Sequence, residues 1–295
     1  MRTSRRTVSD RPASAARRAG LAVALLLAIL VNVWLVGEPG TPSGSDDAAV
    51  SADIAPRGGV ASALADHPLL QQPAAVPTVD CELPAFGQDT VALTAYYLAT
   101  VRCLDQVWEP VLLAAALPFE PPAVDISAEL KASPCGAAPN PQDAVAYYCG
   151  LNHTIYLPID QLLANGGDEP ASHLATLSHE YGHHVQRLSG LLGAADAVMV
   201  KAGLRSAPGL EMSRRVELQA DCFAGMFLHA ASGSASIDAS LAEAAEEDFN
   251  NAAEEPVGDN THGSATSQGR WADNGYRTGS TDSCNTFAAA PDEVL

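Results

Sequence analysis

Hydrophobic residues recur at helical spacing along several stretches of the chain. From Asp89 to about Leu117 the apolar positions fall mostly three or four residues apart, which predicts a helix. Pro110 should break or kink this helix, because proline has no amide hydrogen to donate. The positions that carry the pattern are Val91, Leu93, Ala95, Leu98, Val101, Leu104, Val107 and Leu112.

Three further helices are predicted downstream. The first has Ser172 as its N-cap, runs to about Leu188 and ends near Gly190, since serine favours N-caps and glycine the position after a helix. The other two cover about 210–231 and about 236–253. The first of the three carries an apolar stripe that would bury one face: Leu174, Leu177, Tyr181, Val185 and Leu188.

The remaining pattern predicts one short strand. Residues 152–158 are β-branched and aromatic and end at a proline. Their segment 155–157 is either an edge strand that pairs with an extended peptide or an internal strand. A proline-rich connector occupies 118–123, and the tail from Gly258 is rich in Gly, Ser, Thr and Asn. We expect a mixed α+β fold that is mostly helical, with a small sheet beside the helix that begins at Ser172.

The first 78 residues do not resemble a globular domain. Residues 19–37 are uncharged, apolar and long enough to cross a bilayer as one helix. Residues 1–18 hold six arginines, which should keep this segment cytoplasmic. We favour an uncleaved signal anchor over a cleaved signal peptide, because bulky residues end the apolar run. Residues 38–78 then form a disordered linker rich in Pro, Gly, Ser and Ala, and 79–295 form the domain outside the cytoplasm.

Charge and cysteine content narrow the function classes. The formal net charge is -19, and the arginines concentrate near the N-terminus, so few basic residues remain to neutralise a phosphate backbone. Nucleic acid is therefore disfavoured as a partner, and the acidity suits a soluble surface outside the cell.

All six cysteines follow the apolar run, which favours three disulfides in an exported domain. The sequence has no C-x-x-C pair, which disfavours a cysteine zinc site. The pairing is not decided by the spacing. The pairs that we expect are Cys135 with Cys149, Cys222 with Cys284, and Cys81 with Cys103.

Residues 179–183 read His-Glu-Tyr-Gly-His. Histidines four residues apart share a helix face, so His179 and His183 can bind one metal ion. Glu180 points elsewhere on the helix and can act as the general base on a metal-bound water without being a ligand. The alternative is a partly exposed helix with ordinary histidines. The apolar stripe argues against it, because buried paired histidines need a partner.

A catalytic zinc site needs a third protein ligand and one open position. Glu217 and Asp221 lie four residues apart on the next predicted helix and share a face. We assign Glu217 to the metal and Asp221 to the free ring N–H of His179, which would fix the tautomer of that ring. The alternative is a solvated acidic face, which the neighbouring apolar residues disfavour: Leu218, Ala220, Phe223 and Met226.

These motifs resemble the neutral zinc metallopeptidase family of bacteria. The resemblance rests on 179–186 and 214–225, and it extends over roughly 79–287. Cys135-Gly136, Tyr148-Cys149 and Ile155-Tyr156-Leu157 fit the family upstream, and His262-Gly263-Ser264, Arg270-Trp271, Gly275-Tyr276 and Cys284-Asn285-Thr286-Phe287 fit it downstream. The resemblance implies a zincin-type fold, a glutamate third ligand and a membrane-linked protein. Two departures, Ser267-Gln268 and Asn285, concern the C-terminal contacts and leave the zinc motif intact.

The other histidines receive separate interpretations. His262 lies in a loop that Cys284 could bring toward Cys222, and we hypothesise that it contacts the oxyanion or the substrate. His184 should be a structural, hydrogen-bonding histidine. We expect His153 and His173 at the surface and Tyr181 in the core.

The sequence thus predicts a zinc-dependent endopeptidase anchored in the cell membrane and acting on peptides or proteins outside the cytoplasm. Two rivals stay open. One is a non-catalytic, zinc-stabilised binding module, against which the intact Glu180 argues. The other is a zinc amidase acting on cell-wall bonds.

Overall fold

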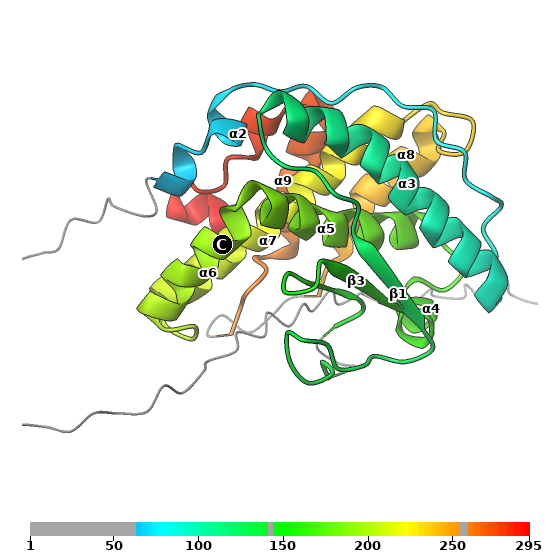
Figure 1. Cartoon of the computed structure of the whole chain (residues 1–295), viewed down its shortest axis with the longest axis horizontal. Helices are drawn as coiled ribbons and strands as arrows, with labels where there is room; N and C mark the ends of the chain where they lie inside the picture. Colours follow the sequence, from blue (N-terminus) through cyan, green and yellow to red (C-terminus); the bar gives the residue numbers. More distant parts are fainter. Residues whose placement is uncertain (1–62, 141–143, 254–258) are drawn as a thin grey trace, which may run out of the picture.

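The computed structural model describes residues 63–140, 144–253 and 259–295. This part of the chain is mostly helical, with a three-stranded sheet (Figure 1). The predicted cytoplasmic segment and transmembrane helix lie outside the described residues. Within the described ranges, no helix is both long and apolar enough to cross a membrane.

Strand β3 (Thr154–Pro158) lies in the middle of the sheet. On one side it pairs in parallel with β1 (Ala123–Ser127), and on the other it pairs antiparallel with β2 (Tyr147–Cys149). Because both edges of β3 are paired, the edge-strand interpretation of residues 155–157 is wrong and the internal one holds. All five residues of β3 are buried, as expected for a central strand.

The predicted helices are present with shifted ends. Helix α3 spans Thr90–Ala114, α5 spans Pro170–Ser189 and α7 spans Ala207–Ala231. The last predicted helix is shorter than expected, because α8 (Ala239–Glu247) gives way to the 3₁₀ helix η1 (Asp248–Asn251). In Figure 1, β1 and β3 lie to one side of α5 and α3 crosses on the other. Helices α3, α5 and α7 thus form the body of the domain.

Two of the longer helices were not predicted from the sequence pattern. Helix α6 (Leu191–Ala202) starts directly after Gly190, whose φ of 84° ends α5. Helix α9 (Ala265–Thr278) forms in the tail that reads as irregular, and it packs closely on α7. A Cβ on Gly275 of α9 would overlap the carbonyl oxygen of Cys222, so glycine allows this close approach. The remaining short helices are α2 (Pro68–Gln71), α4 (Ile159–Gly166), η2 (Thr281–Cys284) and η3 (Pro291–Val294).

The folded part begins earlier than residue 79. Leu69 and Leu70 of α2 are buried, and the amide of Val76 donates to the carbonyl of Gly279 at 2.9 Å. The predicted linker is therefore wrong for residues 63–78, because its leucines and its backbone pack onto the domain.

Two local predictions about helices differ from the structure. Helix α3 runs through Pro110, so the helix does not break there, while a kink at this position stays a prediction. Proline leaves the carbonyl of Gln106 without its helical partner, but Gln106 is exposed and water can take that place. Helix α5 begins at Pro170 with Glu169 as its N-cap, and Ser172 is buried within the first turn. Proline suits the first helical position because its φ is already helical.

All three expected disulfides are present: Cys81–Cys103, Cys135–Cys149 and Cys222–Cys284. The last of them joins α7 to η2, so the C-terminal tail is tied to the most buried helix of the domain. This bond holds the tail beside the site described next.

Candidate metal centre

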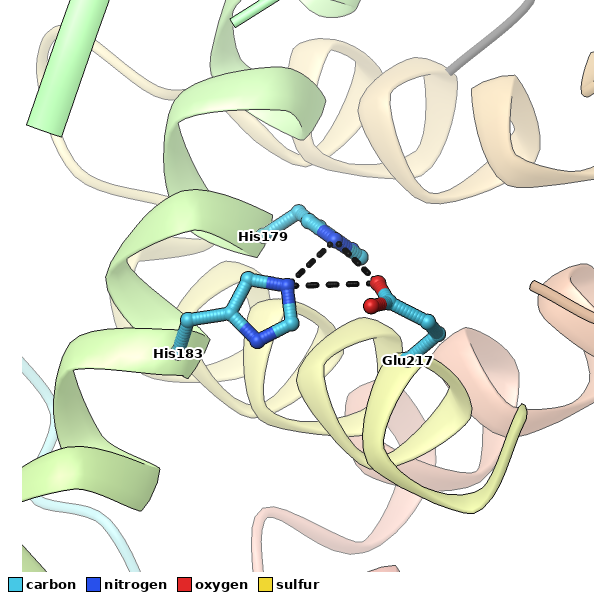
Figure 2. A group of neighbouring side chains, drawn as sticks. All are labelled: His179, His183 and Glu217. Atoms are coloured by element: carbon cyan, nitrogen blue, oxygen red, sulfur yellow. Dashed lines mark hydrogen bonds and ion pairs between the residues drawn. The ribbon is translucent and has the colours of Figure 1, made fainter. Parts of the chain in front are cut away.

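Helices α5 and α7 bring three predicted ligands together (Figure 2). His179 and His183 lie one turn apart on α5, and Glu217 faces them from α7. The Nε2 atoms of the two histidines are 3.1 Å apart, and Oε2 of Glu217 lies 3.3 Å from the first and 3.2 Å from the second. All three side chains are buried. The three atoms form a nearly equilateral triangle.

The size of this triangle fits one zinc ion. Zinc binds imidazole nitrogen and carboxylate oxygen at about 2.0–2.1 Å in a tetrahedron, which places ligand atoms about 3.3 Å apart. The observed separations of 3.1–3.3 Å match this spacing. Three protein ligands leave the fourth position for water or substrate, as catalytic zinc sites do.

A close contact between the two helices sets this geometry. Gly182 lies between the two histidines, and a Cβ there would fall 2.8 Å from the carbonyl oxygen of Ala220 and 2.9 Å from its Cα. Only a residue without a side chain lets α5 approach α7 at this point. Ala220 lies between Glu217 and Asp221, so the contact sits at the level of the carboxylates that face the histidines.

Asp221 orients His179. The ring Nδ1–H of His179 donates to Oδ1 of Asp221 at 2.6 Å, and both side chains are buried. This bond directs the lone pair of Nε2 toward the metal position. Burial alone would lower the pKa of His179, but the carboxylates of Asp221 and Glu217 outweigh it and raise that pKa well above its ordinary value.

Gln186 orients the imidazole of His183, as Asp221 does for His179. Its Oε1 lies 2.9 Å from Nδ1 of His183, one helical turn further along α5. Sequence reasoning missed this residue. The spacing of three residues on one helix could have indicated it, because i and i+3 side chains are neighbours.

Glu180 is fully buried beside the triangle, and neither of its carboxylate oxygens has a hydrogen-bond partner among the described residues. Burial raises its pKa to about 7, while His179 and His183 act in the opposite direction. A carboxyl group with this pKa can both take up and release a proton near neutral pH.

His262 also reaches the site. It is buried, and its Nε2 lies 3.8 Å from Oε2 of Glu217. Its Nδ1 is 2.9 Å from the hydroxyl oxygen of Thr261. The loop before α9 therefore brings a third imidazole to the carboxylate of Glu217, as the proximity of Cys284 to Cys222 suggested.

The electrostatics favour a bound cation. Both oxygens of Glu217, like those of Glu180, lack a hydrogen-bond partner within the described part of the chain. In the metal-binding form, with their Nδ1–H groups committed, His179 and His183 direct Nε2 lone pairs at the same point as the Glu217 carboxylate. A bound metal then takes the place of the second proton that the neighbouring carboxylates favour on His179. Buried lone pairs and negative charge gathered in this way are costly without a positive partner. A divalent cation supplies it, so the residues present fit zinc.

The predictions for three other histidines are partly correct and partly wrong. His184 is structural as expected, since it bonds to the hydroxyl of Tyr148 and the carbonyl of Glu120. His173 is buried rather than exposed, because its ring bonds to the hydroxyl of Tyr97 at 2.7 Å. His153 is partly exposed and contacts Glu120.

Tyr181 lies in the core as predicted, with its hydroxyl donating to Asp105 at 2.6 Å. The two C-terminal departures also make contacts. Asn285 donates its side-chain amide to the carbonyl of Ala65 at 2.8 Å, and Gln268 donates to the carbonyl of Gly263 at 3.2 Å. The second of these holds the loop that carries His262.

Comparison with known proteins agrees with this site. The family model described as "Putative neutral zinc metallopeptidase" matches residues 71–287. The protein Rv2575 of Mycobacterium tuberculosis (strain ATCC 25618 / H37Rv) is 31% identical over 220 residues, which cover 65% of this chain and 70% of the relative. YpfJ of Escherichia coli (strain K12) is 29% identical over 160 residues, 48% of this chain and 53% of the relative. No solved structure matches the chain significantly. The chain belongs to this zinc metallopeptidase family.

Proposed function

We propose that this protein is a zinc-dependent endopeptidase that hydrolyses peptide bonds outside the cytoplasmic membrane. One observation carries the proposal. Three ligand atoms of His179, His183 and Glu217 converge at zinc spacing beside Glu180, a buried carboxylate with no hydrogen-bond partner among the described residues. A structural zinc site would close the fourth position and would not need such a carboxylate.

The proposed mechanism assigns zinc one contribution and leaves the proton transfers to the protein. Bound zinc would acidify water and polarise the scissile carbonyl. Glu180 takes the proton of the attacking water and delivers it to the leaving amine. Burial raises the pKa of this carboxyl group to about 7 in the metal-free protein, which favours its acting as a proton acceptor and donor. Asp221 keeps the imidazole of His179 oriented throughout.

His262 takes the role of a hydrogen-bond donor in this proposal. It lies beside Glu217 and is buried, so its ring is shielded from water. A donor at this place can stabilise the oxyanion that forms when water attacks the carbonyl. Residue His262 would thus act on the substrate rather than on the metal.

The proposed location rests on two features of the chain. Three disulfides are typical of an oxidising compartment. The apolar stretch 19–37 follows a basic segment, which orients a single membrane span with its C-terminal side outside. The catalytic domain would be tethered to the membrane, or secreted if the N-terminal segment is cleaved.

The proposal is tested by purifying the full chain with its disulfides oxidised, measuring zinc per chain and profiling the cleavage of a mixed peptide library. We expect one zinc per chain and peptide cleavage. Glu180→Gln should keep the zinc and lower turnover by about 10²–10⁴-fold, the contribution of a general acid–base. His262→Phe in the same assay should lower kcat and leave zinc binding unchanged, because it removes only the donor.

Other outcomes would replace the proposal. Full activity in Glu180→Gln would refute the proton-transfer role. Zinc binding without cleavage of any peptide would identify a zinc-stabilised binding module, and metal removal should then unfold the domain. Hydrolysis of cell-wall amides but of no peptide would identify an amidase.

A further inference from the structure

A chain of two buried side-chain amides leads away from His183. Oε1 of Gln186 lies 2.9 Å from Nδ1 of His183, and Nε2 of Gln186 lies 3.1 Å from Oε1 of Gln219. Nε2 of Gln219 in turn lies 3.1 Å from the carbonyl oxygen of Cys284. Gln186, Gln219 and Cys284 are fully buried, so water does not compete for these bonds.

Two backbone carbonyls set the direction of every bond in this chain. A carbonyl oxygen can only accept, so Gln219 must donate its amide N–H to Cys284 and turn its oxygen toward Gln186. Gln186 likewise donates one N–H to the carbonyl of Val216 at 2.8 Å and the other to Gln219. Both amide hydrogens of Gln186 are then used, and only its oxygen faces the imidazole.

This direction determines the state of the imidazole. Because the oxygen of Gln186 can only accept, Nδ1 of His183 must carry the proton. A neutral ring with a proton on Nδ1 has its lone pair on Nε2, the atom that points at the metal position. The wrong tautomer would place a hydrogen where the metal binds.

The same amides tie His183 to the helix that carries the third ligand. Val216, which accepts from Gln186, directly precedes Glu217 on α7. Cys284, which accepts from Gln219, is covalently joined to Cys222 of the same helix. The amide chain therefore has fixed points on α7 and on the disulfide-bonded tail.

We propose that Gln186 and Gln219 are positioning residues for zinc, which hold His183 in its metal-binding tautomer and in register with Glu217. The inference deepens the proposed function, because it concerns the same metal site. It also gives the two ligand histidines different supports: a carboxylate for His179 and a neutral amide for His183.

The test measures zinc affinity rather than activity. The full-length chain with its disulfides oxidised is titrated with Zn²⁺ against a competing chelator. Gln186→Met keeps the length of the side chain and removes the amide, and it should raise the Kd for zinc about 10–100-fold, as loss of a ligand-orienting partner does. Gln219→Met removes the two neutral hydrogen bonds of an amide that does not touch His183, and it should raise the Kd by less than about tenfold.

Thr100→Val is the control for loss of a buried hydrogen bond away from the site. Thr100 is fully buried on α3, and its hydroxyl donates to the carbonyl of Tyr96, so the variant also loses one buried hydrogen bond. It should lower stability without changing the Kd for zinc, which separates a local effect at the site from a general loss of stability.

A second readout does not depend on metal or on folding of a variant. In the metal-free wild-type chain, ¹⁵N NMR of labelled histidine should show the proton of His183 on Nδ1. Finding it on Nε2, or finding wild-type zinc affinity in Gln186→Met, would overturn the inference. Reduced affinity in that variant would support it even if the wild-type protein cut no peptide, so the two proposals fail separately.

Discussion

Helix α3 and the α5–α7 interface are both buried, but they bury opposite kinds of side chain. The inward face of α3 is apolar and includes Leu93, Leu104, Val107, Trp108 and Leu112. The α5–α7 interface buries imidazole, carboxylate and amide groups, namely His179, Glu180, His183, Gln186, Glu217, Gln219 and Asp221. The first arrangement stabilises the fold through apolar burial. The second arrangement buries charged and polar groups, which costs free energy, and a bound cation offsets that cost.

The difference indicates that one set of residues determines the stability of the fold and another set determines metal binding and turnover. Changes on α3 should act on folding and spare the metal site, whereas changes between α5 and α7 should act on metal binding or turnover. Removing a buried charge there can even stabilise the metal-free protein. Three substitutions test this separation, in order of decreasing effect.

Trp108→Ala should have the largest effect on stability. Trp108 is 1% exposed and packs edge-on against Phe223 of α7 with ring centroids 5.0 Å apart. Its truncation should cost about 3–5 kcal/mol of unfolding free energy, because a cavity replaces the indole. Urea unfolding measures this loss, and zinc titration of the folded variant should return the wild-type Kd. A zinc affinity that falls along with stability would contradict the separation.

Glu180→Gln should stabilise the metal-free protein at high pH. The pKa of Glu180 is raised by burial from 4.5 to about 7, so between these values the folded state holds a proton that the unfolded chain releases. Raising the pH through this window therefore destabilises wild type, by up to about 3 kcal/mol above pH 7. Glutamine does not ionise and avoids the loss.

Urea unfolding of the metal-free proteins at pH 8 and at pH 4.5 measures this difference. The advantage of Glu180→Gln should be present at pH 8 and nearly absent at pH 4.5. Glu129→Gln, at an exposed position, controls for the removal of one charge. Equal stability of Glu180→Gln and wild type at pH 8 would show that Glu180 does not ionise in a dry site.

Gly182→Ala should have the smallest effect on stability and a clear effect on zinc. The new Cβ would meet backbone atoms of Ala220 at 2.8–2.9 Å, which forces α7 away from α5. We expect a cost of about 1–3 kcal/mol, as for other overpacked sites, together with weaker zinc binding. Gly193→Ala on α6 is the control, because its Cβ would lie 3.6 Å from the nearest heavy atom, in a flexible arginine side chain. Equal zinc affinity in the two variants would argue against the helix contact as the determinant of the site.

Residue spacing predicted the parts of the fold and site that depend on local periodicity. The four-residue spacing of His179 and His183, and that of Glu217 and Asp221, is a property of one helix turn and needs no tertiary information. The three helices with continuous apolar stripes were predictable for the same reason.

The elements and contacts that were not predicted from the sequence depend on contacts between distant segments. Helix α9 has many poor helix formers, and Gly275 within it is explained only by its close contact with Cys222. Strand β1 follows a proline-rich run and becomes a strand by pairing with β3. His173 is buried against Tyr97, 76 residues away, whose hydroxyl bonds to its ring. Propensity and spacing within a segment contain no signal for such partners.

The central claim is that two imidazoles of α5 and one carboxylate of α7 hold a single zinc ion. X-ray absorption spectroscopy of the zinc-loaded full chain tests it most directly. The account predicts one zinc per chain, with nitrogen and oxygen neighbours at about 2.0–2.1 Å, the signature of two imidazoles and no sulfur. A sulfur neighbour near about 2.3 Å, or an unchanged zinc environment in His183→Ala, would contradict it.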